Sequence, residues 1–173
     1  MPADLPILIA AAGIGSRLGM NLPKCLVEVH GRSLLERLLV DVLADERDIR
    51  IVVGFRAEDV IAKARSVRKD LMFVRNPSFR DTSVRHSFWL AARHVQEPCI
   101  IVDGDMLIAP ESWRDFRREA ERHHTLVGVA AATTTDAVFA DVDVLTQQVR
   151  RFTRRDRLGY EWCGVGKMSP RLF

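Results

Sequence analysis

Cysteine is scarce in this sequence, and its spacing forms no framework. The chain of 173 residues has three cysteines, Cys25, Cys99 and Cys163, an odd number without a Cys-x-x-Cys pair. A disulfide scaffold and a thiolate zinc site both need cysteines at paired spacings. We therefore expect buried thiols in a reducing cytoplasm, with no disulfide and no zinc.

The sequence also lacks a long hydrophobic run and a marked net charge. Its first apolar run is too short to cross a bilayer, and no basic segment precedes it. The 26 basic residues nearly balance the 23 acidic ones, so no excess of one sign points to nucleic acid. These absences predict a cytoplasmic protein that binds neither membrane nor nucleic acid.

Strand-like and helix-like segments alternate along most of the chain. Buried strands are predicted at Leu5–Ile9, Ile49–Val53, Leu71–Val74 and Cys99–Val102, with helical patterns between them. Such alternation indicates an α/β fold with a mostly parallel sheet and helices on both faces. Beyond Thr133, alternating segments read as antiparallel or edge strands. The length is most simply one domain, residues 1–173.

A glycine loop follows the first predicted strand. Gly13 and Gly15 let the backbone approach a ligand and point N–H groups at it. Arg17 can fork onto phosphate oxygens, and Lys24, after a rigid proline, adds a second cation. The spacing fits neither a Walker A loop nor a dinucleotide fingerprint, whose third glycine would fall at Leu18. A lone Gly-x-Gly is often an ordinary turn, but the strand and the two cations favour a loop for a nucleoside triphosphate.

Two aspartates, Asp103 and Asp105, follow the predicted strand Cys99–Val102. Open α/β sheets bind ligands at the carboxyl ends of their strands. Against a triphosphate the two carboxylates would be repelled unless a cation lay between, and Mg²⁺ is the cation that such oxygens and phosphate usually hold. The alternative is a solvated Asp-Gly turn. The phosphate loop at the same sheet edge favours Mg²⁺ binding.

An ordered set of positions extends from the glycine loop into the next helix. It consists of Ala11, Ala12, Gly13, Gly15, Arg17, Leu18, Pro23, Lys24, Gly31, Leu34 and Leu35. This set resembles the opening signature of the nucleotidyltransferases that make nucleoside-diphosphate sugars and alcohols. The short segment Val102–Met106 is most similar to cytidylyltransferases for phosphocholine and inositol phosphate. The resemblance implies a Rossmann-like three-layer α/β/α sandwich of the glycosyltransferase-A-like nucleotidyltransferase type, with a mixed, mostly parallel sheet.

The resemblance also implies roles on the nucleotide side. Arg17 and the amides of the loop through Ser16 would hold the β- and γ-phosphates, and Lys24 would bridge the α-phosphate and the incoming phosphate. Mg²⁺ would lie on Asp105, with Asp103 as a helper. The base would meet the backbone of Ala11 and Ala12 and polar groups around Thr82–Ser87, Ser87 included.

On the acceptor side, the resemblance points to two later segments. Arg154 or Arg155 would receive the acceptor phosphate, although both also fit ordinary surface arginines. Tyr160, Glu161, Trp162 and Gly164 resemble the late strand whose glycine meets the transferred group. Tyr160 and Trp162 share a strand face and can wall a pocket for a quaternary ammonium group. Aromatic residues at this spacing are more often half-buried residues of a sheet.

The leading hypothesis is a Mg²⁺-dependent transfer of a nucleoside monophosphate from an NTP, with CTP favoured, to a small phosphorylated alcohol such as phosphocholine. The alternatives are a sugar-1-phosphate or molybdopterin-type nucleotidyltransferase and a non-catalytic nucleotide-binding or regulatory module. A homodimer is left open. The sequence ends at a helix start, Ser169–Pro170. We expect the domain to lack its C-terminal part, a second metal aspartate included, and residues 1–173 to turn over slowly or not at all.

Overall fold

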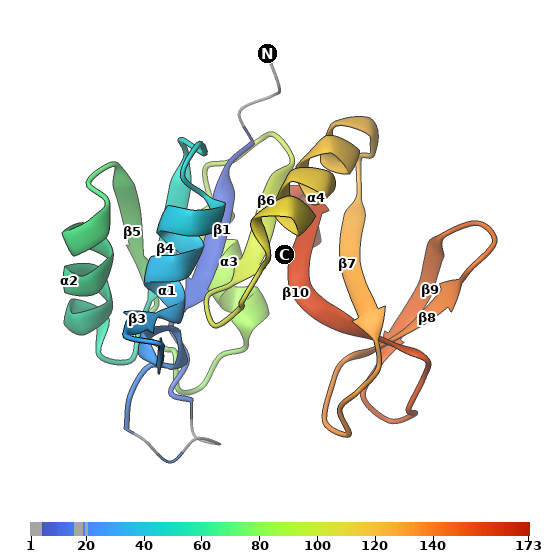
Figure 1. The fold of residues 1–173 in the computed structure, drawn as a ribbon, viewed down its shortest axis with the longest axis horizontal. Coiled ribbons are helices and arrows are strands. Elements are labelled where there is room, and N and C mark those ends of the chain that lie inside the picture. Colours follow the sequence, from blue (N-terminus) through green and yellow to red (C-terminus); the bar gives the residue numbers. More distant parts are fainter. Residues whose placement is uncertain (1–4, 16–18, 20) are drawn as a thin grey trace. The chain divides into compact units, whose positions relative to one another are not determined.

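The computed structural model describes residues 5–15, 19 and 21–173 and divides into two compact units (Figure 1). The first unit contains the chain up to Leu126 together with Gly166–Phe173, and the second contains Val127–Val165. The first holds all the alternating strands and helices. The prediction of a single domain is not tested by this division and stays a prediction.

The first unit is built around parallel strands in the order β5-β4-β1-β6. Their bounds are β1 (Ile7–Ala11), β4 (Ile49–Val53), β5 (Leu71–Arg75) and β6 (Cys99–Asp103). Ile7 pairs with Ile49 on one side and with Ile100 on the other. Apolar residues follow one another along β1 and β6, and along β4 except at Arg50, because both faces of these strands are covered, as is usual in a parallel sheet.

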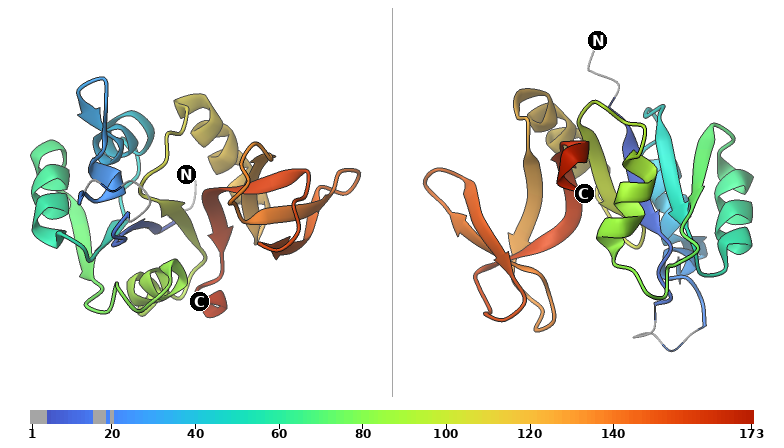
Figure 2. Two further views of the ribbon diagram at one scale, coloured as in Figure 1. Left: turned by 90° about the horizontal axis from the view of Figure 1, so that it is seen from below. Right: turned by 180° about the vertical axis from the view of Figure 1, so that it is seen from behind.

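Helices cover both faces of this sheet, as the alternation predicts. The helical segments are η2 (Lys24–Leu26), α1 (Leu34–Arg37), η3 (Leu38–Val42), α2 (Ala57–Val67), α3 (Val84–Ala92) and α4 (Pro110–Arg122). Figure 2 shows α3 on the face opposite α1 and α2, and α4 on the same side as α1. The predicted three-layer α/β/α arrangement is therefore confirmed for the first unit.

The helix that begins at α1 is capped by Ser33. Ser33 Oγ accepts a hydrogen bond from the backbone N–H of Glu36 at 3.1 Å, which satisfies one free donor of the first turn. The wider turns of η3 continue the helix directly. Just before the cap, β2 (Glu28–Val29) and β3 (Arg32–Ser33) form a short hairpin around Gly31, whose φ is +74°.

The second unit contains antiparallel strands, as the alternating segments predict. Its elements are most of β7 (Leu126–Ala131), β8 (Phe139–Asp143), β9 (Gln148–Thr153) and the first part of β10 (Tyr160–Met168). β8 pairs with both β9 and β10, and β7 also pairs with β10. Beyond β10, Ser169 Oγ accepts from the Arg171 N–H and opens the short turn η4 (Pro170–Leu172), where the sequence predicts a helix start.

Two expectations drawn from absences can be compared with the structure. Cys25 and Cys99 are buried, whereas Cys163 is partly exposed. The prediction of buried thiols is therefore confirmed for Cys25 and Cys99 and is wrong for Cys163. None of the helices formed by the described residues has the length and apolar character that crossing a bilayer requires.

Candidate active site

A cavity of about 370 Å³ lies in the first unit at the carboxyl ends of β1 and β6. Its walls come from the end of β1 and the loop after it, from η2, from the start of α3 and from the turn after β6. The lining residues are Ala10, Ala11, Ala12, Gly13, Gly15, Lys24, Cys25, Phe79, Thr82, Ser83, Val84, Ser87, Asp103 and Asp105. This is where open α/β sheets bind their ligands.

The cavity brings together residues that the sequence analysis assigns to the nucleotide. Those in its lining are Ala11, Ala12, Gly13, Gly15, Lys24, Ser87, Asp103 and Asp105. Ser16 and Arg17 lie outside the described residues. The grouping supports a shared site, and the individual roles stay predictions.

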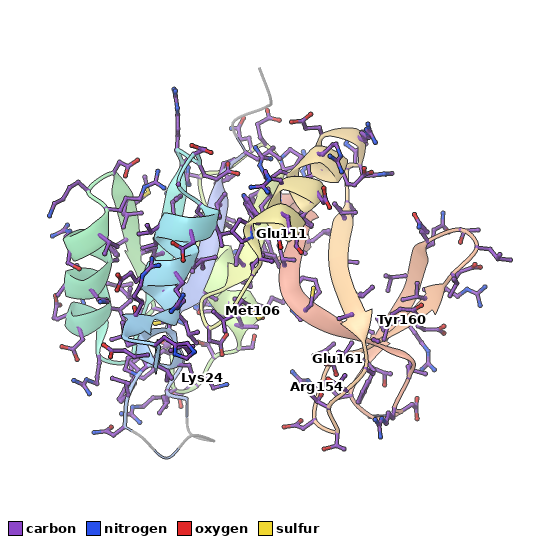
Figure 3. The ribbon with its side chains drawn as sticks, viewed as in Figure 1. Lys24, Met106, Glu111, Arg154, Tyr160 and Glu161 are labelled. Carbon is purple, nitrogen blue, oxygen red and sulfur yellow. The ribbon has the colours of Figure 1, made fainter. Side chains whose placement is uncertain are left out.

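Lys24 is placed by a close backbone contact. Gly15 has φ +67°, and a Cβ built on it would lie 2.9 Å from Lys24 Cγ, so the lysine stem lies against the glycine. A residue with a side chain would be strained at that φ and would push the stem away. The turn η2 then carries Lys24 into the cavity lining (Figure 3). This local geometry explains why a glycine nine positions earlier is needed to hold the lysine.

Asp105 is held just beyond the end of β6. The N–H of Gly104 donates to the Ala10 carbonyl at 2.9 Å, and a Cβ on Gly104 would lie only 2.7 Å from that oxygen. The turn after β6 is thus packed tightly on the end of β1. Lys24 Nζ lies 3.4 Å from Asp105 Oδ2, with 37% and 34% of the two side chains exposed. An ammonium group and a carboxylate therefore lie side by side in one cavity.

Cys25 and Phe79 also line the cavity, and the sequence analysis assigns no role to either. Burial, assisted by the negative charge of Asp105, raises the pKa of the Cys25 thiol to about 12. The thiol therefore stays protonated and packs as an apolar group. Because only the thiolate is a strong nucleophile, the protonated thiol is a weak one. Phe79 lies over Gly54, where a Cβ would come within 2.7 Å of Phe79 Cβ. In the sequence, only the glycine at position 54, directly after a buried strand, could have indicated this close contact.

The predicted acceptor residues all belong to the second unit (Figure 3). Arg154 and Arg155 are exposed, and Arg154 Nη1 lies 4.0 Å from Asp136 Oδ1. Glu161 accepts from the Thr134 hydroxyl at 2.8 Å, and this bond is the main cause that lowers the pKa of its carboxyl group. Glu161 is thus held by Thr134, and Arg154 lies near Asp136. Their role toward an acceptor stays a prediction.

The two aromatic residues of β10 are arranged as a strand requires. Tyr160 and Trp162 are two positions apart and share a face. The Trp162 ring meets Phe152 of β9 edge-on, with the ring centres 6.1 Å apart. Gly164 is buried and has φ +79°, a conformation that favours glycine. The packing of Trp162 accounts for one aromatic as a sheet residue, and the ammonium pocket stays a prediction.

Comparison with known proteins identifies the family. Residues 7–160 match the model of the MobA-like NTP transferase domain. The chain belongs to this family. It is 43% identical over 70 residues to 2-C-methyl-D-erythritol 4-phosphate cytidylyltransferase of Corynebacterium jeikeium, covering 40% of this chain and 25% of the relative. It is 30% identical over 120 residues to the bifunctional protein GlmU of Azorhizobium caulinodans, covering 66% of this chain and 26% of the relative.

The solved structures agree with this family at the level of the fold. The inositol-1-phosphate CTP transferase of T. maritima superposes with a TM-score of 0.76 and 19% identity, covering 99% of this chain and 74% of that one. The prediction of a Rossmann-like nucleotidyltransferase fold is confirmed. The matched part of this chain covers only about a quarter of the length of the two sequence relatives above.

Proposed function

We propose that the protein transfers a nucleoside monophosphate from an NTP, with CTP favoured, to a small phosphorylated alcohol such as phosphocholine, and releases pyrophosphate. The observation that carries the proposal is the pairing of Lys24 with Asp105 in a cavity at the carboxyl ends of β1 and β6. Membership in an NTP transferase family supports the reaction type. One sequence relative is named a cytidylyltransferase and one structural neighbour a CTP transferase, which supports CTP.

The reaction requires stabilisation of negative charge more than it requires a general base. A phosphate monoester is largely dianionic near neutral pH because its second pKa is about 6. Its oxygen attacks the α-phosphorus of the NTP, the new P–O bond forms, and the bond to the β-phosphate oxygen breaks with pyrophosphate as the leaving group. Two anions must therefore meet, and catalysis of this kind depends on positioning and electrostatic stabilisation. The Lys24 ammonium group can lie between the α-phosphate and the acceptor phosphate.

The cavity residues fit Mg²⁺ brought in by a nucleotide. No group of three or more His, Cys, Asp or Glu residues in the described part of the chain could hold a metal by itself. Two carboxylates, Asp103 and Asp105, line the cavity. Mg²⁺ is commonly bound by one or two carboxylates together with substrate phosphates and water. A bound Mg²⁺ would supply positive charge against the phosphates, and Asp105 with Asp103 would hold it.

Specific observations favour a second candidate within the same reaction type. The similarity to GlmU covers 66% of this chain, and the family model is described as MobA-like. A sugar 1-phosphate or a molybdopterin-type phosphate is therefore the alternative acceptor. The chemistry at phosphorus is unchanged in that case, and the base and the acceptor differ.

The test is pyrophosphate release with a matrix of substrates. CTP with phosphocholine or inositol phosphate is compared with UTP and hexose 1-phosphates and with CTP and a molybdopterin phosphate, each with Mg²⁺. Release that is strongest with CTP and a phosphorylated alcohol supports the proposal. Release confined to another pair moves the assignment to the second candidate. Triphosphate binding with no release from any pair would favour a non-catalytic nucleotide-binding module.

A further inference from the structure

A buried polar network lies behind one wall of the cavity. Asn76 follows β5 directly and is only 2% exposed. Its amide nitrogen donates to Thr82 Oγ1 and to Ser87 Oγ, both at 3.1 Å. Its amide oxygen accepts from the backbone N–H of Ser78 at 3.0 Å. Thr82 and Ser87 both line the cavity, so Asn76 reaches the ligand site through their hydroxyl groups.

The orientation of the Asn76 amide is fixed by chemistry. A backbone N–H can only donate, so the amide oxygen must face Ser78. The NH₂ group must then face the two hydroxyls, and each of its protons has one acceptor. The usual ambiguity between the nitrogen and the oxygen of an asparagine side chain does not arise here.

This orientation assigns a hydrogen-bonding direction to each hydroxyl. Thr82 accepts from Asn76 and donates its only hydroxyl proton to the Ser78 carbonyl at 2.7 Å, so it can offer the cavity only a lone pair. Ser87, which is 4% exposed, accepts from Asn76, and no described residue accepts its hydroxyl proton. Ser87 is left as a donor toward the cavity. A hydroxyl without such a partner rotates to suit its ligand.

We propose that Asn76 is a positioning residue for base specificity: by fixing Ser87 as a donor and Thr82 as an acceptor, it makes the cavity discriminate cytosine from uracil. The two bases exchange hydrogen-bond donor and acceptor at ring positions 3 and 4. Cytosine has an acceptor at N3 and an amino group at position 4, whereas uracil has N3–H and a carbonyl there. In any one bound orientation a fixed donor–acceptor pair matches one base and opposes the other. The inference rests on the proposed function, which favours CTP.

The test measures binding by calorimetry with three probes: CTP, UTP and inorganic tripolyphosphate. Tripolyphosphate shares the phosphate chain and lacks the base, so it reports the phosphate side alone. The variants are Asn76→Asp, whose carboxylate accepts from the hydroxyls instead of donating, and Ser87→Ala. Ser66→Ala is the matched control, because Ser66 is an exposed serine of α2 that donates to the Lys63 carbonyl and does not line the cavity.

The wild-type protein is expected to prefer CTP over UTP. Asn76→Asp should lower that preference about ten-fold, and Ser87→Ala should weaken CTP binding about three- to ten-fold, the scale of one hydrogen bond. Both variants should change the affinity for tripolyphosphate less than two-fold. Ser66→Ala should leave the affinities for CTP, UTP and tripolyphosphate unchanged. A merely structural role of Asn76 predicts a different result, because misfolding of the cavity weakens tripolyphosphate as much as CTP.

Other outcomes separate this inference from the proposed function. Equal binding of CTP and UTP by the wild-type protein, or an unchanged preference in both variants, overturns the role of Asn76 and leaves the proposed nucleotidyl transfer to be tested by pyrophosphate release. Binding of neither CTP nor tripolyphosphate by the wild-type protein overturns both. If Asn76→Asp does not fold, Ser87→Ala and Thr82→Val decide the question, because each removes one of the two directed groups and leaves Asn76 in place.

Discussion

Lys24→Met is the most informative single change, because its effects on activity and on stability should differ widely. Methionine keeps an unbranched stem, which can lie against Gly15 as the lysine stem does. The lost ion pair with Asp105 spans 3.4 Å, and about a third of each side chain is exposed. Exposed pairs of this kind contribute about 0–1 kcal/mol to folding. The variant should therefore fold almost as stably as the wild-type protein.

The expected loss of activity is much larger. If the ammonium group contacts the reacting phosphates, its removal takes away one preorganised charge from the transition state. Losses of this type lower kcat by about 10²–10³, equivalent to about 2.7–4 kcal/mol. The effect on the barrier thus exceeds the effect on folding several-fold. A general weakening of the fold cannot produce that combination.

The assay is steady-state pyrophosphate release with the best substrate pair, together with urea unfolding. Lys63→Met is the matched control: Lys63 is also an ion-paired lysine, 2.6 Å from Glu36 and 32% exposed, and it lies on α2 outside the cavity lining. The control should lose about as much stability as Lys24→Met and keep its kcat. An unchanged kcat with a raised KM in Lys24→Met would refute the reasoning and reduce Lys24 to a contact of substrate binding.

Three further predictions concern other residues of the first unit. Asp105→Asn should abolish Mg²⁺-dependent turnover with the fold intact, and Asp103→Asn should be milder; kinetics and circular dichroism of both variants check this, and the reverse order would exchange their roles. Because the unfolded Cys25 thiol ionises near pH 9 whereas burial raises its pKa in the folded protein to about 12, the free energy of unfolding should fall as the pH rises from 9 to 12. Its share of that fall, about 1.4 kcal/mol per pH unit, should vanish in Cys25→Ala, as urea unfolding at pH 8 and 10 will show; an identical slope in the variant would contradict it. Lys167 is 7% exposed and donates to two carbonyls at the C-terminal end of α4, at 2.6 and 2.8 Å. Lys167→Met should therefore lower the free energy of unfolding by about 1–3 kcal/mol, the cost of an unsatisfied buried carbonyl, and a variant as stable as the wild-type protein would count against this cap.

Local patterns in the sequence were sufficient to predict most of the helices and strands. The segment Ile49–Val53 forms β4 with the predicted bounds, because its branched apolar residues, interrupted by Arg50, suit a strand that is mostly buried. Ser33 caps α1 because its side chain needs only the N–H three residues on. Helix α3 begins at Val84 and not at Thr82, whose hydroxyl bonds back to the Ser78 carbonyl instead. Local competition of this kind is difficult to judge from sequence.

The sequence by itself determined the alternation of strands and helices, the glycine loop, and the two aspartates at the end of β6, because each depends on neighbours within a few positions. Only the tertiary structure decided which side chains meet. The pairing of Lys24 with Asp105 and the fixed direction of Ser87 by Asn76 depend on the strand order β5-β4-β1-β6. Strand order is set by packing among segments far apart in the chain, and hydrophobic periodicity carries no information about which strand lies beside which.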